Sequence, residues 1–209
     1  DWSSDVCSSD LAIFFYVGIE VGIPSKLLFY LSEPLSKGGI LGSAVVGGLI
    51  SGFYWLLMLV GRFVSAFISG KVSSRIQLTT TSIVAISLLL VAIFMPETSK
   101  INLIIPDITH WKLIGAEVPT NVVFIVLCGL CTSVMWGVIY NLATEGLGRY
   151  TASASGLFMT MVFGGGVMPL IQDLIATKIG DINSYWLVVA MLSYLLFYAL
   201  VGSRQSKNN

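Results

Sequence analysis

One carboxylate, Glu20, lies in the middle of a long apolar stretch at the start of the chain. Gly18, Gly22 and Pro24 flank it and weaken a helix at that point. A charge at the centre of a bilayer costs roughly 2.5–3.5 kcal/mol on insertion scales, so it needs a partner or a water-filled cavity. Two interpretations stay open. Glu20 faces a cavity with Tyr16 one turn away and binds a sugar hydroxyl or exchanges a proton, or it forms a structural ion pair with another span.

A second group of polar side chains recurs every three or four residues in the fourth apolar stretch. Ser133, Trp136, Tyr140 and Thr144 share one helix face, and Asn141 lies next to them. An aromatic ring beside hydroxyls and an amide suits a sugar, because the sugar ring has an apolar face and a rim that needs hydrogen bonds. The same face could equally serve helix packing.

Basic residues follow the second apolar stretch closely. Arg62 lies within it, and Lys71 and Arg75 lie on the short turn that follows. Glu145 ends the fourth stretch, with Arg149 just beyond it. Bases that clamp a carboxylate in one conformational state can form a gate, so we expect Arg62, Lys71 or Arg75 to approach Glu145.

The other ionisable and sulfur-containing residues carry weaker signals. We expect Lys26 and Asp173 near a membrane interface and His110 in a solvated loop. Cys128 and Cys131 form a Cys-x-x-Cys motif, but a redox pair needs an electropositive, partly exposed setting, and this one is apolar. We therefore interpret both as packing residues and expect neither a cofactor nor a metal site.

The composition indicates the elements that position these groups. Hydrophobic residues make up 56% of the chain and charged residues 11%, against about 25% charged in a soluble domain. A helix needs about 20 apolar residues to cross a hydrocarbon core of about 30 Å. Six stretches qualify: 11–32, 43–70, 76–95, 121–145, 152–177 and 185–201. The fold class is therefore an all-α polytopic membrane protein, and the zero net charge without a basic run excludes nucleic acid as a partner.

Segments outside and within these spans carry further expectations. Residues 1–10 are polar and acidic, and we expect them to be a non-native linker; 205–209 form a polar tail. Segment 96–120 is rich in turn formers and should lie at or beyond the interface, with strands disfavoured in the membrane. Small residues every fourth position should bury the second span, and Pro169 after three glycines should break the fifth near Val167.

Five segments in order resemble the family of fucose–proton symporters and glucose/galactose transporters, within the major facilitator superfamily. They are 14–23, 61–63, 133–135 with 142–148, 154–156 through 164–172, and 197–203. Thr132 and Gly137 depart from the family pattern, since many members carry asparagine and proline there. The resemblance covers essentially all of 11–204.

The resemblance implies the carboxy-terminal half of a twelve-helix transporter in the cytoplasmic membrane, with both ends of this half cytoplasmic. A missing amino-terminal half would complete the sugar site and carry most proton-coupling carboxylates. The implied partners are a monosaccharide and the lipid bilayer, without a cofactor and with H⁺ as the coupling ion. Candidate sugar-binding residues are Tyr16, Glu20, Ser25, Ser133, Trp136, Tyr140, Asn141 and Gln172. Candidate gate residues are Arg62, Lys71, Arg75, Glu145 and Arg149.

Two other classes remain as alternatives. A membrane receptor with the same fold would bind sugar without moving it. A membrane enzyme or respiratory subunit would need haem-ligating histidine pairs, a metal cluster or a nucleophile with its base, and the sole histidine, His110, lies in the loop. We therefore expect a transporter and not an enzyme.

Overall fold

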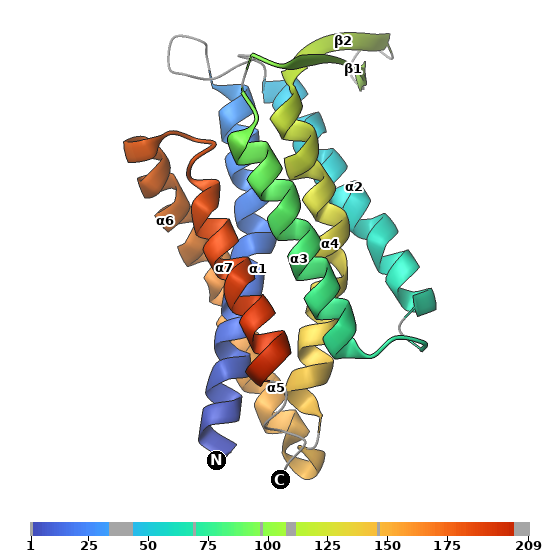
Figure 1. Ribbon diagram of the computed structural model, residues 1–209, viewed down its shortest axis with the longest axis vertical. Helices are drawn as coiled ribbons and strands as arrows, with labels where there is room; N and C mark the ends of the chain where they lie inside the picture. Colours follow the sequence, from blue (N-terminus) through green and yellow to red (C-terminus); the bar gives the residue numbers. More distant parts are fainter. Residues whose placement is uncertain are drawn as a thin grey trace.

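The computed structural model describes residues 2–33, 44–68, 70–96, 98–107, 112–145 and 147–202. Within them the chain forms an elongated bundle of helices capped at one end by a small hairpin (Figure 1). The elements are α1 (Trp2–Ser32), α2 (Ala44–Ile68), α3 (Ser74–Phe94), β1 (Lys100–Asp107), β2 (Lys112–Pro119), α4 (Thr120–Thr144), η2 (Gly148–Tyr150), α5 (Thr151–Thr160), η3 (Met161–Phe163), α6 (Gly164–Ile179), α7 (Tyr185–Phe197) and η4 (Tyr198–Gly202).

Five helical segments of the described chain are long and apolar enough to cross a membrane. They are Cys7–Ser32, Ala44–Ile68, Ser74–Phe94, Thr120–Thr144 and Thr151–Ile179. The sixth predicted span, Tyr185–Val201, is a shorter apolar helix that ends in a π-helical turn. The prediction of six spans thus holds for their position in the chain, and the last is shorter than the others.

The core lies where α1 and α4 meet. Tyr16, Ile19 and Ile23 of α1 are fully buried, as are Ile125 and Met135 of α4. The other helices pack around this pair: α2 against α1 and α4, α3 against α4, α6 against α1, and α7 against α1 and α3.

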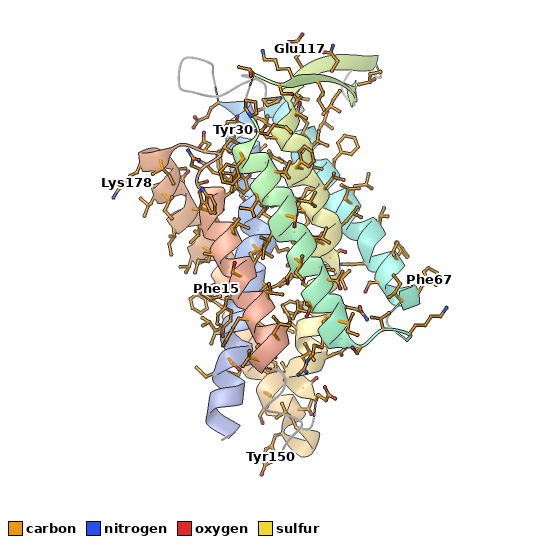
Figure 2. The ribbon with its side chains drawn as sticks, viewed as in Figure 1. Phe15, Tyr30, Phe67, Glu117, Tyr150 and Lys178 are labelled. Carbon is orange, nitrogen blue, oxygen red and sulfur yellow. The ribbon has the colours of Figure 1, made fainter. Side chains whose placement is uncertain are left out.

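Only one stripe of α2 is buried, so the predicted burial of the whole span is wrong. Gly47 packs on α1 and Gly61 on α4, whereas a Cβ atom added at Gly48 or Gly52 would meet nothing within 4 Å. Phe67 is 80% exposed and points away from the bundle (Figure 2). The small residues thus seat α2 on its neighbours along one edge, and its apolar outer face remains for lipid or for another part of a larger protein.

The fifth span is broken, but earlier than predicted. A 3₁₀ turn, Met161–Phe163, separates α5 from α6, and α6 then continues through Pro169. The proline lacks an N–H group, and its ring crowds the carbonyl of the preceding turn. The glycines from Gly164 onward allow the backbone geometry there to change. The break therefore lies ahead of Val167.

An antiparallel hairpin replaces the irregular loop expected between the third and fourth spans. β1 and β2 pair in a register that runs from Lys100 opposite Pro119 to Asp107 opposite Lys112. Ala116 and Val118 are buried and Glu117 is exposed, which is the alternation of a half-buried strand. The hairpin lies beyond the helix ends (Figure 1), so the membrane part remains all-α. His110 and Trp111 lie outside the described residues.

Helix α1 begins at Trp2 and therefore includes most of the acidic stretch that we expected to be a linker. Ser9 and Tyr198 lie 3.0 Å apart through their hydroxyl oxygens, and the Tyr194 hydroxyl donates to the Ser8 carbonyl at 3.2 Å. These contacts join the start of α1 to α7 and η4. The predicted tail, 205–209, lies outside the described residues.

Candidate functional site

The central charges of the bundle form a pair between α1 and α2. Arg62 Nη2 donates to Glu20 Oε1 at 3.1 Å, and the Tyr16 hydroxyl lies next to the same carboxylate. The Glu20 side chain is 15% exposed, whereas that of Arg62 is 53% exposed. Arg62 therefore pairs with Glu20, as in the structural ion pair that was one of the two interpretations for Glu20, and its assignment to the gate stays a prediction.

The exposed side of Arg62 opens into a hollow of about 290 Å³ between α2 and α4. Its lining is Arg62, Ser65, Ala66, Ser133, Val134, Trp136 and Gly137. Behind the wall, the Trp136 ring lies 5.8 Å from the Tyr16 ring, centroid to centroid. Tyr16, Glu20, Ser133 and Trp136, four of the predicted sugar residues, thus lie in or directly behind one hollow. The hollow is lined by an indole, a guanidinium and hydroxyls, and the guanidinium is bound from behind by the Glu20 carboxylate, a combination that suits a polyhydroxylated ring.

The α2–α4 seam sets the width of this hollow. A Cβ atom at Gly61 would collide with the Ser133 hydroxyl, and one at Gly129 would collide with the backbone of Tyr54. The Tyr54 and Thr132 hydroxyl oxygens lie 3.0 Å apart in the buried part of the seam. Close backbone approach and a buried hydrogen bond therefore hold Arg62 opposite α4.

The other four predicted sugar residues lie neither in this hollow nor directly behind it. The Tyr140 hydroxyl lies 2.7 Å from that of Ser155 and so joins α4 to α5. Gln172 is 1% exposed and lies close to Gly22 and Ser184. Asn141 lines a different hollow, and Ser25 is half-buried on α1. Helical spacing placed Tyr140 on the face of Ser133, but α5 covers that end of α4.

An ion cluster with a buried lysine at its centre joins the two charges that the sequence placed near a membrane interface. Lys26 is 8% exposed, and its Nζ lies 3.0 Å from Asp173 Oδ1 and 2.6 Å from Asp181 Oδ1. The cluster ties α1 to α6 and to the turn before α7. Gly18, Gly22 and Lys26 recur every fourth residue, a signal for one contact face on α1 that we did not use.

The remaining gate candidates lie at the end of the bundle where α2 turns into α3. A polar hollow of about 720 Å³ there is lined by Ser73, Ser74, Arg75, Ile76, Asn141, Leu142, Thr144 and Glu145. Arg75 and Glu145 thus border the same space. Lys71 is exposed on the adjoining turn, and Arg149 lies in η2, with its side chain outside the described part.

The Cys-x-x-Cys motif lies inside the bundle. Cys128 is buried with its Sγ 3.9 Å from the Ala85 carbonyl oxygen of α3, and Cys131 is 7% exposed. Across the described residues, no group of three His, Cys, Asp or Glu side chains could hold a metal ion.

Comparison with known proteins identifies transporters along nearly the whole chain, although no family model matches it. The glucose/galactose transporter of Brucella abortus (strain 9-941) is 28% identical over 194 residues, which cover 93% of this chain and 41% of that protein. The putative glucose/galactose transporter of Helicobacter pylori (strain J99) is 29% identical over 204 residues, 95% of this chain and 44% of the relative. The L-fucose-proton symporter of Escherichia coli is 22% identical over 201 residues, which cover 95% of this chain and 40% of that protein.

The fold agrees with these relatives. A crystal structure of FucP, a major facilitator superfamily transporter, in the outward conformation superposes with a TM-score of 0.75 at 16% identity. The superposition covers 95% of this chain and 42% of that one, in its carboxy-terminal half. The family resemblance noted in the sequence is thus confirmed, and the fold is that of half a major facilitator transporter. The chain spans about two fifths of the length of the relatives it matches.

Proposed function

We propose that this chain is the carboxy-terminal half of a secondary transporter that moves a monosaccharide across the cytoplasmic membrane by proton symport. The observation that carries the proposal is the Glu20–Arg62 pair at the edge of the hollow in a membrane-spanning bundle. The names of the relatives, all transporters, give glucose, galactose and fucose as the candidate sugars. Catalysis of a chemical reaction forms no part of this function.

The exposure of the Arg62 side chain indicates where the hollow opens. Its guanidinium lies about two turns from the end of an apolar helix and is half-exposed. A charge at this depth cannot face lipid without a large cost, so it faces water or protein. In the proposal, the hollow therefore opens toward an amino-terminal half, and the sugar binds between the two halves.

The side chains around the hollow supply the contacts a sugar needs. Trp136 offers an aromatic face, and the guanidinium donors of Arg62 that do not contact Glu20 can bind sugar hydroxyls. The Ser133 hydroxyl donates to the Leu130 carbonyl at 2.6 Å, which leaves its oxygen lone pairs for a sugar hydroxyl.

In the proposal, the Glu20–Arg62 pair also couples proton movement to sugar movement. A proton on Glu20 removes the charge that Arg62 neutralises and frees the guanidinium for sugar. We assign H⁺ as the coupling ion on this basis. The gate then rests on Arg75 and Glu145 at the end of the bundle where α1 begins, which we place in the cytoplasm, with the hairpin outside.

Uptake by the full-length protein tests the proposal. Proteoliposomes with an inward proton gradient should accumulate labelled glucose, galactose or fucose, and Trp136→Ala should reduce accumulation at least about tenfold, since stacking and burial there contribute more than about 1.4 kcal/mol. The matched control is Trp186→Ala, a tryptophan that is 43% exposed and packs on Phe94. Sugar binding without uptake would indicate a receptor, and equal effects of the two substitutions would remove the hollow from the sugar path.

A further inference from the structure

Tyr16 lies behind the wall of the sugar hollow, next to Glu20 and Trp136. It is fully buried, and its ring lies 5.8 Å from the Trp136 ring at an angle of 46°. Glu20 follows one turn later on α1, and helical side chains lean toward the amino terminus of their helix, so the Glu20 carboxylate lies beside the Tyr16 hydroxyl. Tyr16 therefore contacts both a side chain of the hollow and the carboxylate that holds Arg62.

The Tyr16 hydroxyl is buried without a formed hydrogen bond. Among the described residues it has no partner at normal hydrogen-bonding geometry, although the Glu20 carboxylate is next to it. A buried hydroxyl without a partner is unfavourable, because it has lost its hydrogen bonds to water and has gained none in the protein. By contrast, the hydroxyl of the buried Tyr185 donates to the Ile23 carbonyl at 3.1 Å. The Tyr16 hydroxyl is thus a spare donor.

The Glu20 carboxylate can accept a hydrogen bond from this spare donor. Arg62 donates to Glu20 Oε1 at 3.1 Å, but a carboxylate has two oxygens and about four lone-pair sites. A rotation of the carboxylate toward Tyr16 weakens the Arg62 contact and forms an O–H···O bond in its place. The guanidinium then keeps its own contacts with water or a ligand, because half of the Arg62 side chain is exposed and lines the hollow.

We propose that Tyr16 is a positioning residue that replaces Arg62 as the hydrogen-bond donor to Glu20 when the guanidinium binds sugar. The exchange lowers the cost of taking Arg62 from a covered carboxylate, because Glu20 passes from one donor to another and is never without one. Tyr16 acts in this way without touching the sugar. The sugar step rests on the proposed function, whereas the exchange of donors rests only on the contacts around Glu20.

Thermal unfolding of the full-length protein in detergent tests the exchange of donors without sugar. Tyr16→Phe removes the hydroxyl but keeps the ring against Trp136, so the thermal midpoint should stay unchanged or rise. Tyr185→Phe is the matched control: it removes a formed hydrogen bond and should lower the midpoint. Arg62→Met should lower the midpoint more in the Tyr16→Phe background than alone, because neither donor is then left for Glu20.

Two results of this cycle would overturn the proposal. Equal effects of Arg62→Met in the two backgrounds would show that the Tyr16 hydroxyl does not take over from the guanidinium. A loss of stability in Tyr16→Phe as large as that in Tyr185→Phe would show that the hydroxyl is already bonded in the sugar-free protein.

Sugar binding tests the functional step. Tyr16→Phe should weaken the binding of labelled glucose, galactose or fucose at least about tenfold, the effect of one hydrogen bond to a charged group. In the Glu20→Gln background no charge needs a new donor, so adding Tyr16→Phe should change the affinity less than about twofold. Tyr185→Phe should leave the affinity unchanged.

Infrared difference spectra with and without sugar report on the hydroxyl directly, because the C–O stretching frequency of tyrosine depends on its hydrogen bond. A sugar-induced shift of this band should vanish in Tyr16→Phe and remain in Tyr185→Phe. Unchanged affinity and a retained shift in Tyr16→Phe would overturn the proposal while the transporter function stands. A protein that binds none of the three sugars would overturn the proposed function and the sugar step with it, and the stability cycle would then decide the exchange of donors.

Discussion

The Arg62 guanidinium lies 3.1 Å from the Glu20 carboxylate and joins α1 to α2 inside the membrane-spanning part of the bundle. The pair is asymmetric, because Glu20 is mostly covered while half of the Arg62 side chain is exposed. The charge of Glu20 therefore needs Arg62 as a partner, whereas the charge of Arg62 can be stabilised by water without Glu20.

This asymmetry predicts a difference between two single substitutions. Arg62→Gln leaves a covered carboxylate without its cation and should lower the free energy of unfolding by about 1–3 kcal/mol. Glu20→Gln leaves the exposed arginine to water or to another part of the protein and should cost less. The double substitution should cost less than the sum of the two, since both remove the same contact. Thermal unfolding of the full-length protein in detergent measures all three, and additive effects would contradict the pairing.

Glu20→Gln also separates coupling from sugar binding. The amide keeps the size and most of the hydrogen bonding of the carboxylate but cannot carry a charge. In proteoliposomes we expect loss of proton-driven accumulation with sugar exchange retained, because exchange needs no net proton movement. Loss of both activities would assign Glu20 to sugar binding. Unchanged affinity and accumulation would make Glu20 a purely structural residue.

The sequence identified Glu20 and Arg62 singly but not as a pair. Each stood out because a charge in an apolar run needs a reason to be there. Their pairing depends on how α2 crosses its neighbours, and that crossing is set by Gly47 against α1 and Gly61 against α4. Small residues every fourth position predict close contact but do not name the partner helix. We therefore expected Arg62, Lys71 or Arg75 at Glu145 and did not predict which basic residue pairs with Glu20.

Other differences have equally local causes. The spans were predictable because membrane crossing demands a minimum length of apolar chain. The β1–β2 hairpin was not predictable, because Pro106 and Pro119, near its two ends, indicated turns. They concealed the alternation of apolar and polar residues around Val118 that is typical of a strand. The buried position of Lys26 was also missed, since Asp181 lies in a turn between spans and carries no periodic signal.

The Gly61 contact predicts that one added methyl group disturbs the site. Gly61→Ala would place a Cβ atom against the Ser133 hydroxyl and 3.0 Å from the Leu130 carbonyl oxygen, and overpacking of this kind costs about 1–3 kcal/mol. Sugar affinity should fall as well, because Arg62 moves with α2. Gly52→Ala on the same helix meets nothing within 4 Å and should stabilise by up to about 1 kcal/mol through helix propensity. Thermal unfolding and sugar binding of both variants give the comparison, and equal behaviour would show that the seam has room to relax.

The Lys26 cluster predicts a stability effect without a direct effect on the sugar site. Lys26→Met keeps the length and apolar stem of the side chain but leaves Asp173 and Asp181 without their shared cation. Asp173 is 62% exposed and can be solvated, whereas Asp181 is 24% exposed, so most of the expected loss of about 2 kcal/mol comes from Asp181.

A second substitution checks that cause. Adding Asp181→Asn to Lys26→Met removes the unpaired charge and should recover part of the loss, because replacing both partners of a covered pair costs less than breaking it. Lys178→Met is the matched control: this lysine is exposed in the last turn of α6, and the change should stay within about 0.5 kcal/mol. The Lys26→Met effect should persist in 1 M salt, since covered pairs are weakly screened, and an effect that vanishes in salt would place the cluster in open solvent.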